Sequence, residues 1–238
     1  MASFEMTPRT AFETPLAIGA DRVTAFLRKV YGWMFVGLAI TAATAFAVAG
    51  SPALVQAIFG NPILFIALIV AELGLVIALS ARVDRMAPRT AAVLFVTYSA
   101  LNGATLSAIL LAFTGASLAT TFVVTAGMFG ALALYGTTTK RSLAGVGQFF
   151  FMGLIGLVLA SIVGLFWRAP ALQFVISVVG VLVFTGLTAW DAQRLKAMAA
   201  VTPDDRVAGR SVVGALALYL DFINLFLFLL RFLGARRD

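Results

Sequence analysis

Residues 212–230 read VVGALALYLDFINLFLFLL. A helix needs roughly 17–25 predominantly apolar residues to cross a bilayer, and this run is long enough. Its one charged residue is Asp221. A carboxylate at hydrocarbon depth costs about 2.5–3.5 kcal/mol on insertion scales. The stretch therefore predicts a membrane-spanning helix whose acid has a partner, a water-filled cavity or a functional role.

Similar apolar runs recur along the whole chain. Hydrophobic residues make up 62% of the 238 positions and charged residues 11%, and the mean hydropathy is +1.04. A soluble core of this size cannot hide so much apolar surface. Six further spans are expected at about 30–49, 63–81, 91–112, 117–135, 147–167 and 171–191. We expect an all-α integral membrane protein: a cytoplasmic segment (1–29), a seven-transmembrane-helix bundle (30–234) and a C-terminal tail (235–238).

The positive charges follow a topological pattern. Thirteen of the 17 Lys and Arg residues lie in the N-terminal segment and in the connections after the second, fourth and sixth spans. By the positive-inside rule this distribution places the N-terminus in the cytoplasm, so the net charge of +7 does not indicate nucleic-acid binding. The first 29 residues lack a signal-peptide pattern, and we expect a bacterial inner membrane. Arg231, Arg236 and Arg237 would face outward after seven crossings, which leaves a re-entrant last segment as an alternative.

The composition also excludes several chemistries. The chain has no Cys and no His, which argues against thiolate metal sites, zinc hydrolysis and Ser-His catalysis. Two aspartates on adjacent helices could serve an intramembrane aspartyl protease. However, Thr188-Ala189-Trp190 precedes Asp191, where such a protease would carry a Gly-x-Gly element. We expect no enzyme and no cofactor.

Asp191 and Asp221 form the candidate site. If the sixth span continues as a helix past Asp191, the rise of 1.5 Å per residue lets the two acids reach similar depths. Two carboxyls within hydrogen-bond reach in a low-dielectric site cannot both ionise easily, so they would share one proton and sense pH. When deprotonated and hydrated they would bind Ca2+ weakly, as a leak pathway requires. Alternatively, Asp191 is a solvated residue near a helix end.

Three other polar residues are expected to support this pair. Asn224 lies one turn beyond Asp221 and either orients its carboxyl or bridges two helices. Arg82 ends the second span on the same side as Asp191 and is a candidate latch, or simply a positive-inside residue. Glu72, about 15 Å deeper along the same helix, is either a further cation site or a hydrogen-bonded, protonated acid.

The last apolar run resembles the final helix of the Bax inhibitor family, also called transmembrane Bax inhibitor motif proteins, and the chain is similar to its bacterial members. The matching segments are 215–226 with 229–232, 190–196, 26–34, 72–75 and 102–103. The resemblance implies a seven-helix bundle with helix 7 central. It also implies a pH-sensitive calcium leak controlled by two aspartates, which fall on Asp191 and Asp221. The family's arginine latch falls on Arg82, with Arg85 as the alternative.

Several functions remain open at this point. The first is a passive, proton-regulated cation leak in which Ca2+ is the permeant ion. The second is a regulatory partner of a membrane protease or another membrane complex, since bacterial relatives include modulators of a membrane-bound protease. A coupled proton antiporter is the third. The expected partners are the lipid bilayer, Ca2+, protons and a membrane protease, and no nucleic acid.

Overall fold

The fold is a helical bundle, seen here in a computed structural model that describes residues 15–82, 85–167 and 169–237. Seven of its helices are long and apolar enough to cross a membrane, which confirms the expected all-α membrane fold. The elements are α1 (Pro15–Ala49), α2 (Pro52–Phe59), α3 (Pro62–Arg82), α4 (Pro88–Ala112), α5 (Gly115–Thr138), α6 (Ala144–Phe166), α7 (Pro170–Val201), the 3-10 turn η2 (Asp204–Arg206) and α8 (Val207–Leu233). The short α2, which does not span, was not predicted.

Prolines and polar caps set the starts of several helices. Proline stands in the first turn of α2, α3, α4 and α7, where its missing N–H costs no helical hydrogen bond. Ser51 caps α2 through a hydrogen bond from the Leu54 N–H. The Asn61 side chain accepts hydrogen bonds from the first backbone amides of α3. These local signals fix where the chain turns back into the membrane.

Two helices extend beyond their predicted apolar spans. The first was expected from residue 30, but α1 begins at Pro15; residues 20–29 contain no Gly or Pro and continue the helix beyond the apolar run. The sixth was expected to end at residue 191, but α7 continues to Val201. The added turns of α7 bury Ala192, Leu195 and Ala199 against the bundle, and this packing stabilises helix beyond the purely apolar segment.

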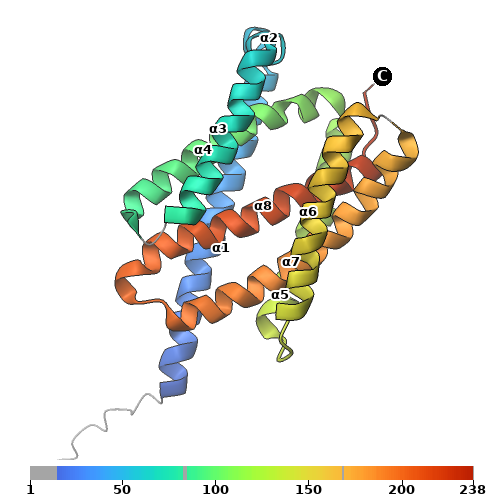
Figure 1. Cartoon of the computed structure of the whole chain (residues 1–238). Coiled ribbons are helices and arrows are strands. Elements are labelled where there is room, and N and C mark those ends of the chain that lie inside the picture. Colours follow the sequence, from blue (N-terminus) through green and yellow to red (C-terminus); the bar gives the residue numbers. More distant parts are fainter. Residues whose placement is uncertain (1–14, 83–84, 168, 238) are drawn as a thin grey trace, which may run out of the picture.

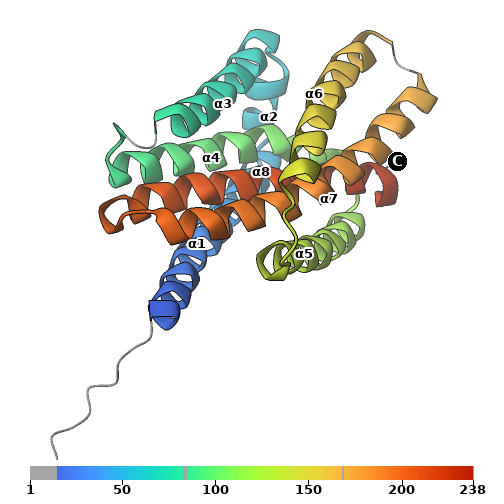
Figure 2. The same ribbon diagram turned by 60° about the horizontal axis from the view of Figure 1, so that its bottom comes forward.

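The last spanning helix lies at the centre of the bundle, as the resemblance implied. In α8, 61% of the most apolar window is buried inside the protein, against 6% in α3 and 11% in α6. Figure 1 and Figure 2 show α8 passing between α4 and α7, with α1 crossing beside it. The 27 residues of α8 span about 40 Å at 1.5 Å per residue. This unbroken length favours a full crossing over the re-entrant alternative.

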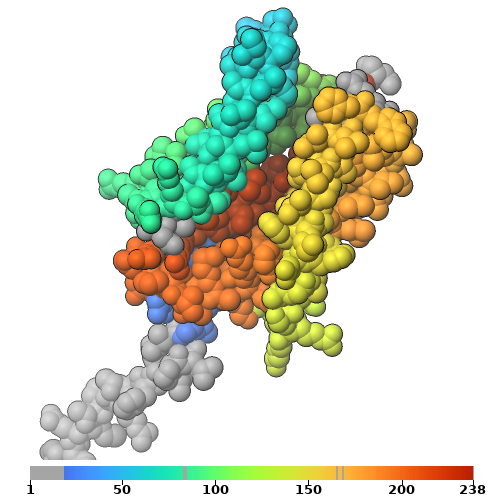
Figure 3. All heavy atoms as spheres, viewed as in Figure 1, coloured from blue at the N-terminus to red at the C-terminus, as the bar shows by residue number. Residues whose placement is uncertain are grey.

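The outer helices present apolar surface that a bilayer would cover. Ile63 at the start of α3 is 80% exposed and Phe166 at the end of α6 is 87% exposed. In the space-filling view α3 and α6 lie on either side of α8, which is visible between them (Figure 3). Such surfaces are stable only in hydrocarbon, which is consistent with the membrane assignment.

The C-terminal residues pack against the connection between α4 and α5. The Arg237 N–H donates to the Ala112 carbonyl at 3.0 Å, and the Thr114 N–H donates to the Ala235 carbonyl at 3.1 Å. The Ala235 N–H donates to the Ser117 hydroxyl. The part of the predicted tail up to residue 237 is therefore hydrogen-bonded to the bundle end where α8 finishes.

Candidate functional site

Asp221 is buried in the middle of the bundle. Only 5% of the residue is exposed, and within the described part of the chain its Oδ2 has no hydrogen-bond partner. Buried polar groups are normally paired, because an unpaired one keeps the full cost of leaving water. The position is therefore energetically unfavourable unless a proton, a water or a cation satisfies that oxygen.

Two close approaches fix how α7 and α8 pack together. Gly214 of α8 lies against the Leu195 side chain of α7. Gly180 of α7 lies against the Phe228 ring of α8. In both places a Cβ atom would collide with the facing side chain, so glycine allows the helices to approach this closely. The two contacts define an antiparallel register along the whole helix pair.

This register brings the two aspartates near each other. Interpolating between the two contacts places Asp221 level with Leu187 and Thr188 of α7. Asp191 is three to four residues further along α7, which corresponds to about 5 Å along the axis. The charges of the two carboxyls interact electrostatically. The condition that the sixth span continue as a helix past Asp191 is met, and the acids lie about one turn apart in depth.

The two acids have different surroundings. The Asp191 side chain is 14% exposed and forms an ion pair with Arg194, with 3.8 Å between Oδ1 and Nη1. Arg194 is 61% exposed, and its guanidinium also lies over the Trp190 ring at 5.7 Å from the centroid. Asp191 therefore has a cation at the edge of the bundle, whereas the carboxyl of Asp221 lies deeper.

The candidate latch residues do not reach Asp191 in this structure. Arg82 is exposed at the end of α3, and no hydrogen bond or ion pair between it and Asp191 occurs among the described residues. Arg85 lines a polar cavity of about 320 Å³ together with Arg206 and Arg210 at the start of α8. The cation beside Asp191 is Arg194 instead, a residue on its own helix. The latch at Arg82 or Arg85 stays a prediction.

The Asn224 side chain forms its hydrogen bond within its own helix. Its Nδ2 donates to the Leu220 carbonyl at 2.8 Å, and over the described residues no bond joins it to Asp221. The amide therefore neither orients the carboxyl nor bridges two helices in this conformation. A polar side chain inside an apolar helix often satisfies itself on the carbonyl four residues earlier.

Glu72 belongs to a second polar cluster that lies on another side of α8. Its Oε2 is 3.2 Å from the Asn102 amide, and its Oε1 accepts from Thr105 at 3.0 Å. The Tyr219 hydroxyl of α8 donates to Asn102 Oδ1 at 2.9 Å and lies 2.6 Å from the Thr41 hydroxyl of α1. The cluster joins α1, α3, α4 and α8.

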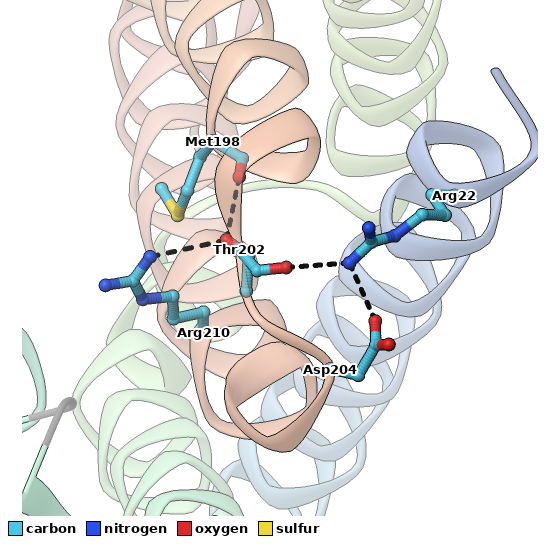
Figure 4. A network of polar contacts seen from close by, with 5 residues as sticks. All are labelled: Arg22, Met198, Thr202, Asp204 and Arg210. Atoms are coloured by element: carbon cyan, nitrogen blue, oxygen red, sulfur yellow. Dashed lines mark hydrogen bonds and ion pairs between the residues drawn. The ribbon is translucent and has the colours of Figure 1, made fainter. Parts of the chain in front are cut away.

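A third polar network ties the start of α1 to the turn between α7 and α8 (Figure 4). Arg22 donates to the Thr202 carbonyl at 3.2 Å and to Asp204 Oδ1 at 2.7 Å. Arg210 donates to the Thr202 hydroxyl, which itself donates to the Met198 carbonyl. Thr202 is 1% exposed, so this small clasp holds together the helix ends that follow Asp191 and precede Asp221.

Sequence inspection missed both networks. Neither Asn102 nor Tyr219 was predicted to join a network, although a polar group at hydrocarbon depth signals a hydrogen bond across helices. Arg22 entered only the count of positive charges, and Asp204 was not singled out. They are 182 positions apart in the chain, and no local pattern in one sequence can pair residues so distant.

Comparison with known proteins identifies the family. The family model described as "Inhibitor of apoptosis-promoting Bax1" matches residues 23–238. The chain belongs to the Bax inhibitor family. The matched region includes all seven spanning helices from residue 23 onward, so the aspartate pair and both ends of the Glu72 cluster lie inside it.

Individual relatives support the assignment over nearly the whole chain. Inner membrane protein YbhL of Escherichia coli is 50% identical over 215 residues, which cover 89% of this chain and 92% of YbhL. An uncharacterized protein of Borreliella burgdorferi is 46% identical and covers 90% of this chain and 93% of its own length. Protein RP147 of Rickettsia prowazekii, also uncharacterized, is 43% identical with 90% of both chains covered.

Proposed function

We propose that this Bax inhibitor family member is a passive, pH-sensitive leak for cations, with Ca2+ as the permeant ion, controlled by a proton that Asp191 and Asp221 share. The observation that carries the proposal is the buried Oδ2 of Asp221, which has no hydrogen-bond partner among the described residues and interacts electrostatically with a second carboxyl. A shared proton satisfies both groups, since it neutralises one charge and donates a hydrogen bond to the other.

The geometry suits passage of a cation better than its storage. Among the residues that the structure describes, no group of three or more His, Cys, Asp or Glu side chains could hold a metal ion. Ca2+ takes six to eight oxygen ligands, so two carboxylates alone give a weak site. Weak binding allows an ion to leave as readily as it enters. The cation is the transported species here and not a resident cofactor.

The proposed location is a bacterial inner membrane with the N-terminus in the cytoplasm. YbhL is named an inner membrane protein, and the seven apolar helices suit the same environment. The orientation follows from the distribution of Lys and Arg. It places the α7–α8 turn, with its Arg22 clasp, on the cytoplasmic side, so Asp191 would lie nearer the cytoplasm than Asp221.

The test is Ca2+ flux into liposomes that contain the purified protein, measured with an entrapped calcium dye across a series of pH values. We expect wild-type flux to change with pH, because protonation of the pair changes its charge. Asp221→Asn should abolish that dependence. Asp205→Asn is the matched control, since it removes an exposed acid from the α7–α8 turn and should leave the pH profile unchanged.

Three outcomes would contradict the proposal. Flux equal to that of protein-free liposomes at every pH would remove the leak and leave the regulatory-partner hypothesis. A pH profile of Asp221→Asn that matches wild type would keep the leak but remove the aspartate pair from its control. Uphill Ca2+ movement driven by a proton gradient would identify an antiporter.

A further inference from the structure

The Glu72 cluster contains a chain of four contacts whose hydrogens can be counted. In the structure Asn102 Nδ2 donates to Glu72 Oε2 at 3.2 Å, and the Tyr219 hydroxyl donates to Asn102 Oδ1 at 2.9 Å. The Tyr219 hydroxyl lies 2.6 Å from Thr41 Oγ1, and Thr41 Oγ1 lies 2.9 Å from the Ser99 carbonyl oxygen. Each contact needs one hydrogen, and each hydroxyl supplies only one.

With a charged Glu72 the count falls short by one. A carboxylate only accepts, so Asn102 must point its NH2 at Glu72 and its carbonyl oxygen at Tyr219. The Tyr219 hydroxyl then donates its single hydrogen to the Asn102 carbonyl oxygen. The single hydrogen of the Thr41 hydroxyl would then have to bond both the Tyr219 oxygen and the Ser99 carbonyl oxygen, because a carbonyl has no hydrogen to donate. One of two short buried oxygen–oxygen contacts is then left without a hydrogen.

With a neutral Glu72 each of the four contacts in this chain is satisfied. Glu72 donates from Oε2 to the Asn102 carbonyl oxygen, and the Asn102 NH2, turned the other way, donates to Tyr219. Tyr219 donates to Thr41, and Thr41 donates to the Ser99 carbonyl. The two ends of an amide have almost the same shape, so the same positions accommodate either orientation. The Thr105 hydroxyl lies 3.0 Å from Glu72 Oε1 and 2.9 Å from the Asn102 backbone carbonyl oxygen, and these two contacts share its one hydrogen in either state of Glu72.

The electrostatic surroundings of Glu72 point the same way. Its hydrogen-bond partners Asn102 and Thr105 are neutral, and the ion pairs found among the described residues do not include it. The titratable groups that interact with its charge are the phenols Tyr98 of α4 and Tyr219 of α8. Glu72 lies on the least buried spanning helix, at a depth where an ionised side chain is costly.

We propose that Glu72 is a proton-binding site, occupied at neutral pH, and that its proton sets the direction of one continuous hydrogen-bond chain from α3 to α4, α8 and α1. The site is separate from the aspartate pair and does not depend on the leak. Loss of the proton forces the Asn102 amide to turn round and removes one hydrogen bond between α1 and its neighbours. Glu72 therefore acts as a pH-dependent lock on the packing of α1 against α8.

The direct test is infrared spectroscopy of the full chain in lipid vesicles. A protonated carboxyl gives a C=O band that shifts in D2O. In the Asp191→Asn/Asp221→Asn variant the aspartate pair contributes nothing, so a band that remains at neutral pH and disappears when Glu72→Gln is added supports the proposal. If the double variant shows no such band at neutral pH, Glu72 is charged and the proposal fails.

Thermal denaturation of single variants gives an independent test if the multiple variants do not fold. Glu72→Gln reproduces the neutral pattern, because its NH2 donates to Asn102 while its carbonyl accepts from Thr105. We expect it to melt near the wild-type temperature at neutral pH, whereas Glu72→Ala should melt several degrees lower. Equal losses in Glu72→Gln and Glu72→Ala would show that Asn102 and Thr105 bind a carboxylate, and would overturn the proposal. Neither measurement involves Ca2+, so a failed leak does not affect this result.

Discussion

Removal of one hydroxyl, by Tyr219→Phe, tests the cluster at the centre of the bundle. Tyr219 is 0% exposed, and its ring packs edge to face on Phe95 at 5.8 Å and on Tyr98 at 5.7 Å between centroids. Phenylalanine keeps these ring contacts, so packing is preserved and the effect comes from the hydroxyl alone. The substitution breaks the contacts to Asn102 and Thr41.

The size of the effect can be bounded. Side-chain hydrogen bonds inside membranes average about 0.6 kcal/mol and reach about 1.7, so two give roughly 1–3 kcal/mol. A buried acceptor left unpaired costs about 1–3 kcal/mol, but part of this overlaps with the lost bonds. We expect Tyr219→Phe to lower the free energy of unfolding by about 1.5–3 kcal/mol.

The assay is reversible unfolding in mixed micelles with increasing SDS, followed by circular dichroism. Tyr135→Phe is the matched control, because it deletes the same atom from a tyrosine that is 51% exposed. Surface substitutions usually stay within about 0.5 kcal/mol. If Tyr219→Phe also changes stability by less than about 0.5 kcal/mol, the contacts of its hydroxyl do not stabilise the bundle and the reasoning is wrong.

Two further substitutions test the packing and the clasp. Gly136→Ala should lower the free energy of unfolding by about 1–3 kcal/mol, because the added Cβ would collide with the Ala189 backbone of α7. In the control Gly130→Ala the added Cβ meets no atom within 4 Å, so this substitution should stabilise α5 by about 0.5–1 kcal/mol. Equal effects of the two substitutions in the same SDS titration would contradict the close approach of α5 and α7. Arg22→Ala should cost at most about 1 kcal/mol, less at high salt, because Arg22 and Asp204 are 47% and 88% exposed; a larger, salt-independent loss would show that the clasp is structural.

Hydropathy predicted the spanning helices because the cost of exposing backbone and polar groups to hydrocarbon leaves few alternatives. It predicted the edges poorly. The extra turns of α7 are stabilised by Ala192, Leu195 and Ala199 packing inward, and a window that looks for continuous apolar residues misses an amphipathic extension. The start of α1 was missed for a related reason, since residues 15–29 mix apolar and charged side chains and continue the helix beyond the apolar run.

The sequence predicted the buried acid of the candidate site from composition. It did not predict the alignment of α7 against α8, which brings the second acid close. Asp221 stands out because it is the one charge in its span, and the structure places it in the interior. The distance between α7 and α8, and therefore the proximity of Asp191, depends on the contacts of Gly214 and Gly180, which a single sequence does not reveal. Arg194 was not named as the neighbour of Asp191, although a residue three positions later on the same helix lies on the same face.

The position of Tyr219 two residues before Asp221 limits how α8 can move. At 3.6 residues per turn their side chains leave the helix about 200° apart, so one points at α1 and α4 while the other interacts with α7. Rotation of α8 about its long axis would break the contacts of the Tyr219 hydroxyl with Asn102 and Thr41 before it moved the Asp221 carboxyl a large distance. A change in the separation of the two aspartates therefore costs less when α7 moves, and spectroscopic labels that test the proposed leak belong on that helix.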